Sequence, residues 1–236
     1  MRIWITKSGY RIIKILSGRS NVFLLTNGEK NVLIDTSPGF MWSLLDKRLK
    51  KLNVSIVDYL ILTHAHFDHA ANSNKIKKYY NSSVIIHQSE AANLAAGRNT
   101  ITSGTNLIYK LISKYLAKPW MTVLNYEPCE CDFTVNTTFD LTNIGFNAYI
   151  LHTPGHTKGS MSVIVDDEIA LVGDCMFGVF RSSVYPPVAE NPQEMIKSWG
   201  ILLDTDCSIF VPSHGSANSR ALVQKDYNKR ISRSGT

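Results

Sequence analysis

Short runs of apolar residues, separated by Gly and Asn, dominate the first third of the chain. Three of these runs, at residues 10–16, 21–26 and 31–35, have the length and β-branched content of strands. The residues between them favour turns. We therefore expect three neighbouring strands in an antiparallel meander.

A helical pattern follows from about residue 37 to residue 50, opening with Ser-Pro-Gly. Its apolar side chains recur at the spacing that places them on one helix face. These are Met41, Leu44, Leu45 and Leu49. The next run, 56–62, is almost continuously apolar, as expected for a strand that is covered on both faces.

Between residues 70 and 96 the pattern predicts a helix at 70–80, a strand at 84–87 and a helix at 89–96. Residues 97–128 break this alternation, although a helix is predicted at 106–116. We treat about 88–128 as a helical insertion that either caps a pocket or packs on the surface. Its large side chains are candidates for substrate selection: Tyr109, Tyr115, Trp120, Met121 and Tyr126.

The second half of the chain is again rich in strand patterns. Two β-rich halves that each carry helices predict an α+β domain, 1–236, with two sheets packed face to face and helices outside. The predicted strands are 132–135, 146–152, 161–165, 169–172 and 208–211, and the predicted helices are about 192–203 and 217–229.

The composition indicates the class of protein and its expected cellular location. The chain has 236 residues, of which 44% are apolar, enough for one large core. No apolar run approaches the roughly 18 residues that span a bilayer, and the first residues do not form a signal peptide. We expect a cytoplasmic protein without a membrane partner. Its four cysteines, too few for a disulfide framework, are expected to be reduced.

The formal charge of +6 is concentrated in two helical segments, around residues 47–51 and 225–233. Solvated helix faces account for such charge, and no aromatic-interleaved basic stripe accompanies it. Nucleic acid is therefore disfavoured as a partner without being excluded. A small-molecule substrate is expected, and a homo-oligomer is left open.

Four potential metal ligands lie within six residues: His64, His66, Asp68 and His69. Imidazole and carboxylate groups together bind zinc, iron and manganese. If the chain stays extended after Leu62, His64 and His66 point the same way, because strand side chains alternate with a period of two. A turn at Phe67 would direct Asp68 and His69 elsewhere, which favours a second ion.

Three further candidates stand at the ends of predicted strands, beside Gly or Pro. They are His156 in Thr-Pro-Gly-His, Asp174 after Gly173, and His214 in Ser-His-Gly. Glycine lets the backbone approach a site closely, so these loops are suited to complete a metal centre.

This ordered set resembles the metallo-β-lactamase superfamily over essentially the whole chain. The resemblance implies an αββα four-layer sandwich, with His64, His66 and His156 binding a first ion and Asp68, His69 and His214 a second. Asp174 would bridge the two ions. Asp35 resembles a family residue near the site, for which we expect a supporting hydrogen-bonding role, whereas His87 and His152 match no ligand position.

The bridging aspartate is similar to that of the glyoxalase II, lactonase and ribonuclease Z branches rather than that of the true β-lactamases. Antibiotic hydrolysis is therefore disfavoured. Two divalent ions, zinc first with iron or manganese as alternatives, would hold a bridging hydroxide that attacks a carbonyl or phosphoryl centre. Asp68 is the predicted catalytic residue, orienting the nucleophile and carrying its proton.

Three reactions fit this chemistry. The first is glyoxalase II-like hydrolysis of a thioester, lactone or other ester, which residues 173–177 (Gly-Asp-Cys-Met-Phe) favour by their similarity to that branch. The sequence pattern predicts no separate C-terminal helical domain for glutathione, however, and Phe177 stands where lactonases carry a tyrosine. Tyr185 is an alternative for that role, although packing is the role that we expect for it. The alternatives are a phosphodiesterase resembling ribonuclease Z and an iron-dependent, persulfide dioxygenase-like oxidoreductase.

Overall fold

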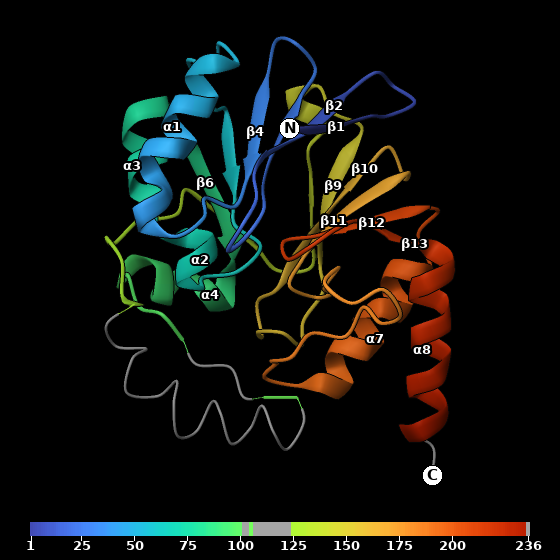
Figure 1. Cartoon of the computed structure of the whole chain (residues 1–236). Helices are drawn as coiled ribbons and strands as arrows, with labels where there is room; N and C mark the ends of the chain where they lie inside the picture. The colour runs from blue at the N-terminus through green and yellow to red at the C-terminus, as the bar shows by residue number, and fades with distance from the viewer. Residues whose placement is uncertain (101–103, 106–123, 235–236) are drawn as a thin grey trace.

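Two β-sheets face each other at the centre of the molecule, and helices cover the outer face of each sheet (Figure 1). The structure is a computed structural model that describes residues 1–100, 104–105 and 124–234. The layers follow one another as helix, sheet, sheet and helix. This arrangement confirms the predicted α+β class and the αββα sandwich.

The first sheet contains seven strands in the same order as along the chain. Its first four strands pair antiparallel, and the pairs from β4 to β7 are parallel. The carboxyl ends of β4, β5 and β6 therefore meet at one edge of the sheet. The strands are β1 (Arg2–Ile5), β2 (Arg11–Leu16), β3 (Val22–Thr26), β4 (Asn31–Ile34), β5 (Tyr59–Ile61), β6 (Ser83–His87) and β7 (Phe133–Val135).

The second sheet has six strands in the order β13-β12-β11-β10-β9-β8. Its pairs are antiparallel except for β11 and β12, which run parallel, so that the loops after these two strands leave the sheet at the same edge. The strands are β8 (Thr138–Asp140), β9 (Ala148–His152), β10 (Met161–Val165), β11 (Ile169–Gly173), β12 (Ile209–Pro212) and β13 (Asn218–Ser219).

Three apolar clusters fill the spaces between the four layers. One cluster joins the first sheet to its helices through side chains such as Leu45 and Ile76. A second lies between the sheets, and a third packs Trp199 against the outer face of the second sheet. The covering helices are α1 (Trp42–Lys51), α3 (Ser73–Tyr80) and α4 (Gln88–Ala95) on the first sheet, and α7 (Pro192–Leu203) and α8 (Arg220–Ser234) on the second.

Most elements lie where the hydrophobic pattern predicts them, including the strand at 161–165 and the helix at 192–203. Two short edge strands, β1 and β8, were not predicted. β8 has only three residues and β1 buries only Trp4, so neither contains a long enough alternation to stand out. The predicted helix at 106–116 lies outside the described residues.

Two helix starts were predicted wrongly. The helix predicted from residue 70 begins at Ser73, because the buried Asn72 amide donates to the carbonyls of Thr36, Ser37 and Pro38, while a separate short helix, α2 (Phe67–Ala70), precedes it. The helix predicted from residue 217 begins at Arg220. Residues 218–219 instead pair with β12.

The composition gave expectations for the cysteines and for membrane-spanning segments. All four cysteines are free, and three of them are buried. Among the described residues, no helix has both the length and the apolar character needed to cross a membrane.

Candidate metal centre

The seven predicted ligands converge at one edge of the sandwich, where loops from both sheets meet. His64, His66, Asp68 and His69 follow β5, with the last two on α2. His156 lies in the turn between β9 and β10, and Asp174 and His214 follow β11 and β12. The amide of Met161 donates to the carbonyl of Thr63 at 2.9 Å, which ties the two sheets together beside these loops.

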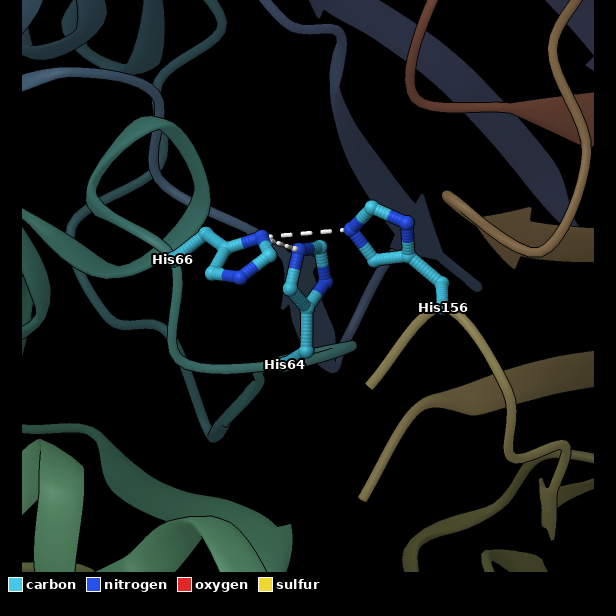
Figure 2. Close-up of side chains that lie close together, drawn as sticks. All are labelled: His64, His66 and His156. Atoms are coloured by element: carbon cyan, nitrogen blue, oxygen red, sulfur yellow. Dashed lines mark hydrogen bonds between the residues drawn. The ribbon is translucent and has the colours of Figure 1, made fainter. Parts of the chain in front are cut away.

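Three imidazoles form the first group. Nε2 of His64 lies 2.8 Å from Nδ1 of His66, and Nε2 of His156 lies 3.2 Å from the same atom. Figure 2 shows the rings turned toward one another, with His156 approaching from the opposite side to the other two. Burial lowers the pKa of all three side chains, so that each is neutral at pH 7, the form that binds metals.

Asp68, His69 and His214 form the second group. Nε2 of His69 lies 3.8 Å from Oδ1 of Asp68, and Nε2 of His214 lies 3.7 Å from the other oxygen of that carboxylate. The potential ligand atoms of this group, like those of the first, all lie within 4.8 Å of one another.

Asp174 lies between the two groups. One of its oxygens is 3.6 Å from Nε2 of His156 and 3.2 Å from Nε2 of His214, and the other is 3.5 Å from Nε2 of His69. A single carboxylate thus faces both groups. This is the position that the predicted bridging ligand requires.

The donor set fits divalent cations. Nε2 of His69 and Oδ1 of Asp174 are buried and have no hydrogen-bond partner in the described part of the chain. Buried polar atoms are rarely left unsatisfied, so two such atoms in one cluster indicate a missing partner. Neutral imidazole nitrogens and carboxylate oxygens are the ligands that zinc, iron and manganese accept.

The acidic and imidazole groups at the centre shift one another's pKa values. Burial favours the neutral form of Asp174, but His214 and His69 outweigh this effect and hold its pKa well below the usual value. Burial also opposes protonation of His69, yet Asp174, Asp35 and Asp68 raise its pKa well above the ordinary value. A divalent cation at this place would displace such protons.

Asp35 supports His69 through a hydrogen bond to Nδ1, as the sequence predicts. Its carboxylate accepts hydrogen bonds from the Thr63 amide at 2.9 Å, from His69 Nδ1 at 2.8 Å and from the Ser213 hydroxyl at 3.0 Å. Nδ1 of His156 is held in the same way by the carbonyl of Val188 at 3.0 Å. Both contacts leave Nε2 free for the centre.

Two glycines are required by close packing at the ligand loops. Gly155 has φ +127°, and a Cβ atom there would lie 2.1 Å from the amide nitrogen of Met195 in α7. Gly173 has φ +54°, and its Cβ would lie 2.8 Å from Cβ of Thr63. These glycines allow the loops that carry His156 and Asp174 to press against their neighbours.

Two further supporting residues escaped the sequence analysis. Asn21 donates its amide hydrogen to the carbonyl of Ser213 at 2.6 Å, beside His214. The buried carboxylate of Glu90 accepts from the amides of Ala65 and Gly159, each at 3.3 Å, and thereby connects the two loops of the first group. Neither residue belongs to a motif, although an acid among the packed positions of α4 is a weak signal.

A pocket of about 470 Å³ opens onto the centre. His66, Asp68, His156, Asp174 and His214 form its floor. Among the described residues, its walls are mainly apolar, with one arginine at the edge. The wall residues are Gly18, Arg19, Phe67, Asn99, Thr100, Leu124, Phe177 and Val188.

The remaining candidates take other positions. His87 and His152 stack on each other, with ring centroids 4.0 Å apart, and do not join the ligand groups. Tyr185 packs against Trp199, so it does not take over the role of a lactonase tyrosine. Tyr126 donates to the carbonyl of Ala65 at 2.7 Å. The other aromatic and Met candidates, Tyr109, Tyr115, Trp120 and Met121, lie outside the described residues.

Comparison with known proteins gives a consistent picture. The family model of the metallo-β-lactamase superfamily matches residues 17–214. A probable metallo-hydrolase of Methanocaldococcus jannaschii is 32% identical over 158 residues, which are 67% of this chain and 68% of that protein. The hydroxyacylglutathione hydrolase GloC of Haemophilus influenzae is 26% identical over 87% of this chain and 90% of its own length.

A solved structure shares the fold. The archaeal metallo-β-lactamase superfamily protein ST1585 from Sulfolobus tokodaii superposes with a TM-score of 0.62 at 22% identity. The match covers 92% of this chain and 81% of that one. At this level of identity the likeness concerns the architecture alone.

Proposed function

This chain belongs to the metallo-β-lactamase superfamily, and on that premise we propose that it is a metal-dependent hydrolase of small molecules that cleaves a thioester, lactone or other ester-type bond. One observation carries the proposal. Seven side chains that can bind metals converge into two adjacent groups beside a pocket that five of them line, and Asp174 faces both groups.

Each group would hold one divalent ion, with zinc first and iron or manganese as alternatives. His64, His66 and His156 would bind one ion, Asp68, His69 and His214 the other, and Asp174 both. When bound, such a pair of ions polarises a substrate carbonyl and lowers the pKa of the attacking water.

Asp68 is the residue that we assign to proton transfer. Its side chain is 13% exposed, and it borders the pocket within reach of His69 and His214. A carboxylate in this position would accept the proton of the attacking water and return it to the leaving group. Thr63 and Ser213 hold Asp35, which in turn fixes the ring of His69.

The pocket walls suit a substrate with an apolar portion. Phe67, Leu124, Phe177 and Val188 present apolar surface to the space above the floor. Asn99, Thr100 and Leu124 belong to the segment 88–128 and line the pocket. This supports our proposal that the insertion borders the substrate within one domain spanning the chain.

The carbonyl reaction has the strongest support among the three considered. The relative from Haemophilus influenzae is a hydroxyacylglutathione hydrolase, and acyl transfer from sulfur to water is the glyoxalase II type of reaction. Phe177 packs against His214, with ring centroids 4.5 Å apart, and brings no hydroxyl group to the pocket. This favours a thioester over a lactone.

The test is a substrate panel assayed with protein that has been reconstituted with zinc, manganese or iron. We expect turnover of acyl thioesters or activated esters, with kcat reduced by about a hundredfold or more in Asp68→Ala and unchanged in Asp58→Asn. Cleavage of bis(4-nitrophenyl) phosphate without ester cleavage would instead establish a phosphodiesterase. One iron per chain together with oxygen consumption would establish the dioxygenase reaction.

A further inference from the structure

We propose that Arg19 forms an anion-binding subsite at the mouth of the pocket, and that the substrate carries a carboxylate or phosphate group that this arginine recognises. The inference rests on the proposed hydrolase function and adds a substrate class to it. It comes from the position of one loop, residues 17–21, which joins β2 and β3.

Two side chains of this loop form hydrogen bonds on both sides of the second ligand group. The hydroxyl of Ser20 donates to the carbonyl of Asp68, one residue before His69. The side-chain amide of Asn21 donates to the carbonyl of Pro212 at 2.9 Å and to that of Gly215 at 3.1 Å, on either side of His214. Since Ser20 and Asn21 are buried, the loop holds a fixed place beside the centre.

The side chain of Arg19 is not held in the same way. It is 61% exposed, and its closest carboxylate contact is Nε to Oδ2 of Asp68 at 3.9 Å, beyond hydrogen-bonding distance. Its guanidinium carbon lies 5.5 Å from the centroid of the Phe67 ring. Within the described chain, Asp68 is the one carboxylate that forms an ion-pair contact with this guanidinium group, and the contact is made to Nε. A fork of N–H donors is therefore available to a ligand.

The distribution of charge around the pocket suits the Arg19 guanidinium group for binding an anion. Among the described residues that line the pocket, Arg19 is the one lysine or arginine, and the Phe67 ring and the Asp68 carboxylate lie beside it. Arginine binds carboxylate and phosphate groups through two parallel hydrogen bonds, which fixes the orientation of the bound group. A substrate whose anionic group reaches Arg19 would thus be oriented with its reactive bond over the floor of the pocket.

A simpler role would be to offset the charge of Asp68. An exposed contact at 3.9 Å contributes little to that end. The two roles also predict different kinetics. An arginine that only balances Asp68 would affect all substrates equally, whereas an anion subsite would affect only charged substrates.

Matched esters can separate these roles in the metal-loaded, full-length protein. Phenyl hexanoate and the monophenyl ester of adipic acid have the same chain length, but only the second ends in a carboxylate. Phenyl butyrate and 3-carboxyphenyl butyrate form the corresponding pair with the charge on the leaving group. Wild type, Arg19→Gln and Arg19→Lys are compared at two ionic strengths.

We expect Arg19→Gln to raise KM for the anionic ester of at least one pair by about fivefold while leaving its neutral counterpart unchanged. Arg19→Lys should recover part of the loss, and added salt should raise the wild-type KM for that ester alone. The pair that responds identifies which end of the substrate is charged. Hexanamide and adipamate, the monoamide of adipic acid, tested as inhibitors of phenyl hexanoate cleavage, give the same comparison without turnover.

Equal losses on charged and neutral esters, or no change on any of them, would overturn the anion subsite. Either result presupposes that the wild type cleaves the neutral esters. A wild type that is inactive on every ester and thioester contradicts the proposed hydrolase itself, and this outcome is distinct from a failure of the Arg19 inference.

Discussion

Nδ1 of His69 lies 2.8 Å from the carboxylate of Asp35, and both side chains are completely buried. A carboxylate can only accept a hydrogen bond, so one ring proton is held on Nδ1, and a cation that displaces the second ring proton would bind Nε2. Nε2 is the atom that faces Asp68 and Asp174. The contact therefore selects the ring form that binds a cation.

The first prediction concerns Asp35→Asn. Asn tolerates the left-handed backbone at this position, where φ is 61°, but it replaces one acceptor oxygen with a donor. We expect metal affinity to fall by about ten- to a hundredfold, measured by competition with a chromogenic chelator. Asp58→Asn, which changes a carboxylate bound to Lys30 far from the centre, should leave the affinity unchanged. Equal affinities in the two variants would contradict the role of Asp35.

The second prediction concerns metal removal. A chelator should lower Tm, and zinc at about a hundred times its dissociation constant should restore about 2.7 kcal/mol of stability, because the ion binds the folded chain. His214→Gln should reduce the bound metal from two ions to one per chain by elemental analysis. His152→Gln removes a histidine outside the ligand groups and should retain both ions. Undiminished stoichiometry in His214→Gln would argue against the second group.

A third prediction tests the packing of the His156 loop. In Gly155→Ala the new methyl group would meet the backbone of Met195, and the backbone has a φ that alanine rarely adopts. We expect a loss of about 3 kcal/mol or more by urea unfolding. Gly9→Ala has a similarly positive φ of +83° with nothing within 4 Å of its Cβ, and should cost only about 1 kcal/mol. Similar losses in both variants would show that backbone strain, rather than close approach, is decisive at Gly155.

The fourth prediction concerns Glu90, whose two oxygens accept from Ala65 and Gly159. Glu90→Gln retains one acceptor and leaves the other amide facing a donor, so we expect a loss of about 1 to 3 kcal/mol in urea unfolding. Glu127→Gln, at an exposed site, should change stability by no more than about 0.5 kcal/mol. If the two variants are equally stable, the Glu90 contacts do not hold the loops.

The fifth prediction concerns acid stability and Asp166. Burial would raise the pKa of this carboxyl group, but hydrogen bonds from Ser8 and Asn147 outweigh it and lower the pKa below 3.8. Because the folded-state pKa is depressed, the stabilisation is complete above the unfolded value and is lost as the pH falls through the folded value. Asp166→Asn should be less stable than wild type by about 1 to 2 kcal/mol at pH 7.

This difference should shrink as the pH falls below about 3.8, which urea titrations at pH 7 and pH 3 would measure. Asn is suited to the left-handed φ of 56° at this turn, so the comparison isolates the loss of the acceptor. A difference that is constant with pH would assign it to packing instead.

The sequence reveals the layers of the fold well because they depend on periodicity. The strand at 161–165 is buried throughout, as its apolar composition predicts. The run at 56–62 is buried at Leu60, Ile61 and Leu62, but Ile56 is exposed and the strand spans only Tyr59–Ile61. The start of α3 could not be predicted in the same way. It depends on the side chain of Asn72 bonding to residues that are more than thirty positions away.

The candidate site likewise contains some residues that local motifs reveal and others that only long-range contacts define. His64, His66 and His156 stand in recognisable motifs, and the structure brings them together, while their role as ligands stays a prediction. Arg19 and Glu90 act through partners brought near only by the folded chain, so neither gives a local signal. Long-range contacts of a side chain with the backbone leave no period in the sequence.

Each ligand group combines residues from loops of both sheets, so both sheets are needed to form it. His64 and His66 follow a strand of the first sheet, whereas His156 is attached to the second, so neither half alone can provide the complete first group. A cation bound by this whole group would therefore require the two halves to be docked across the apolar layer between them. A bound ion would then cross-link two halves that hydrophobic burial alone had brought together.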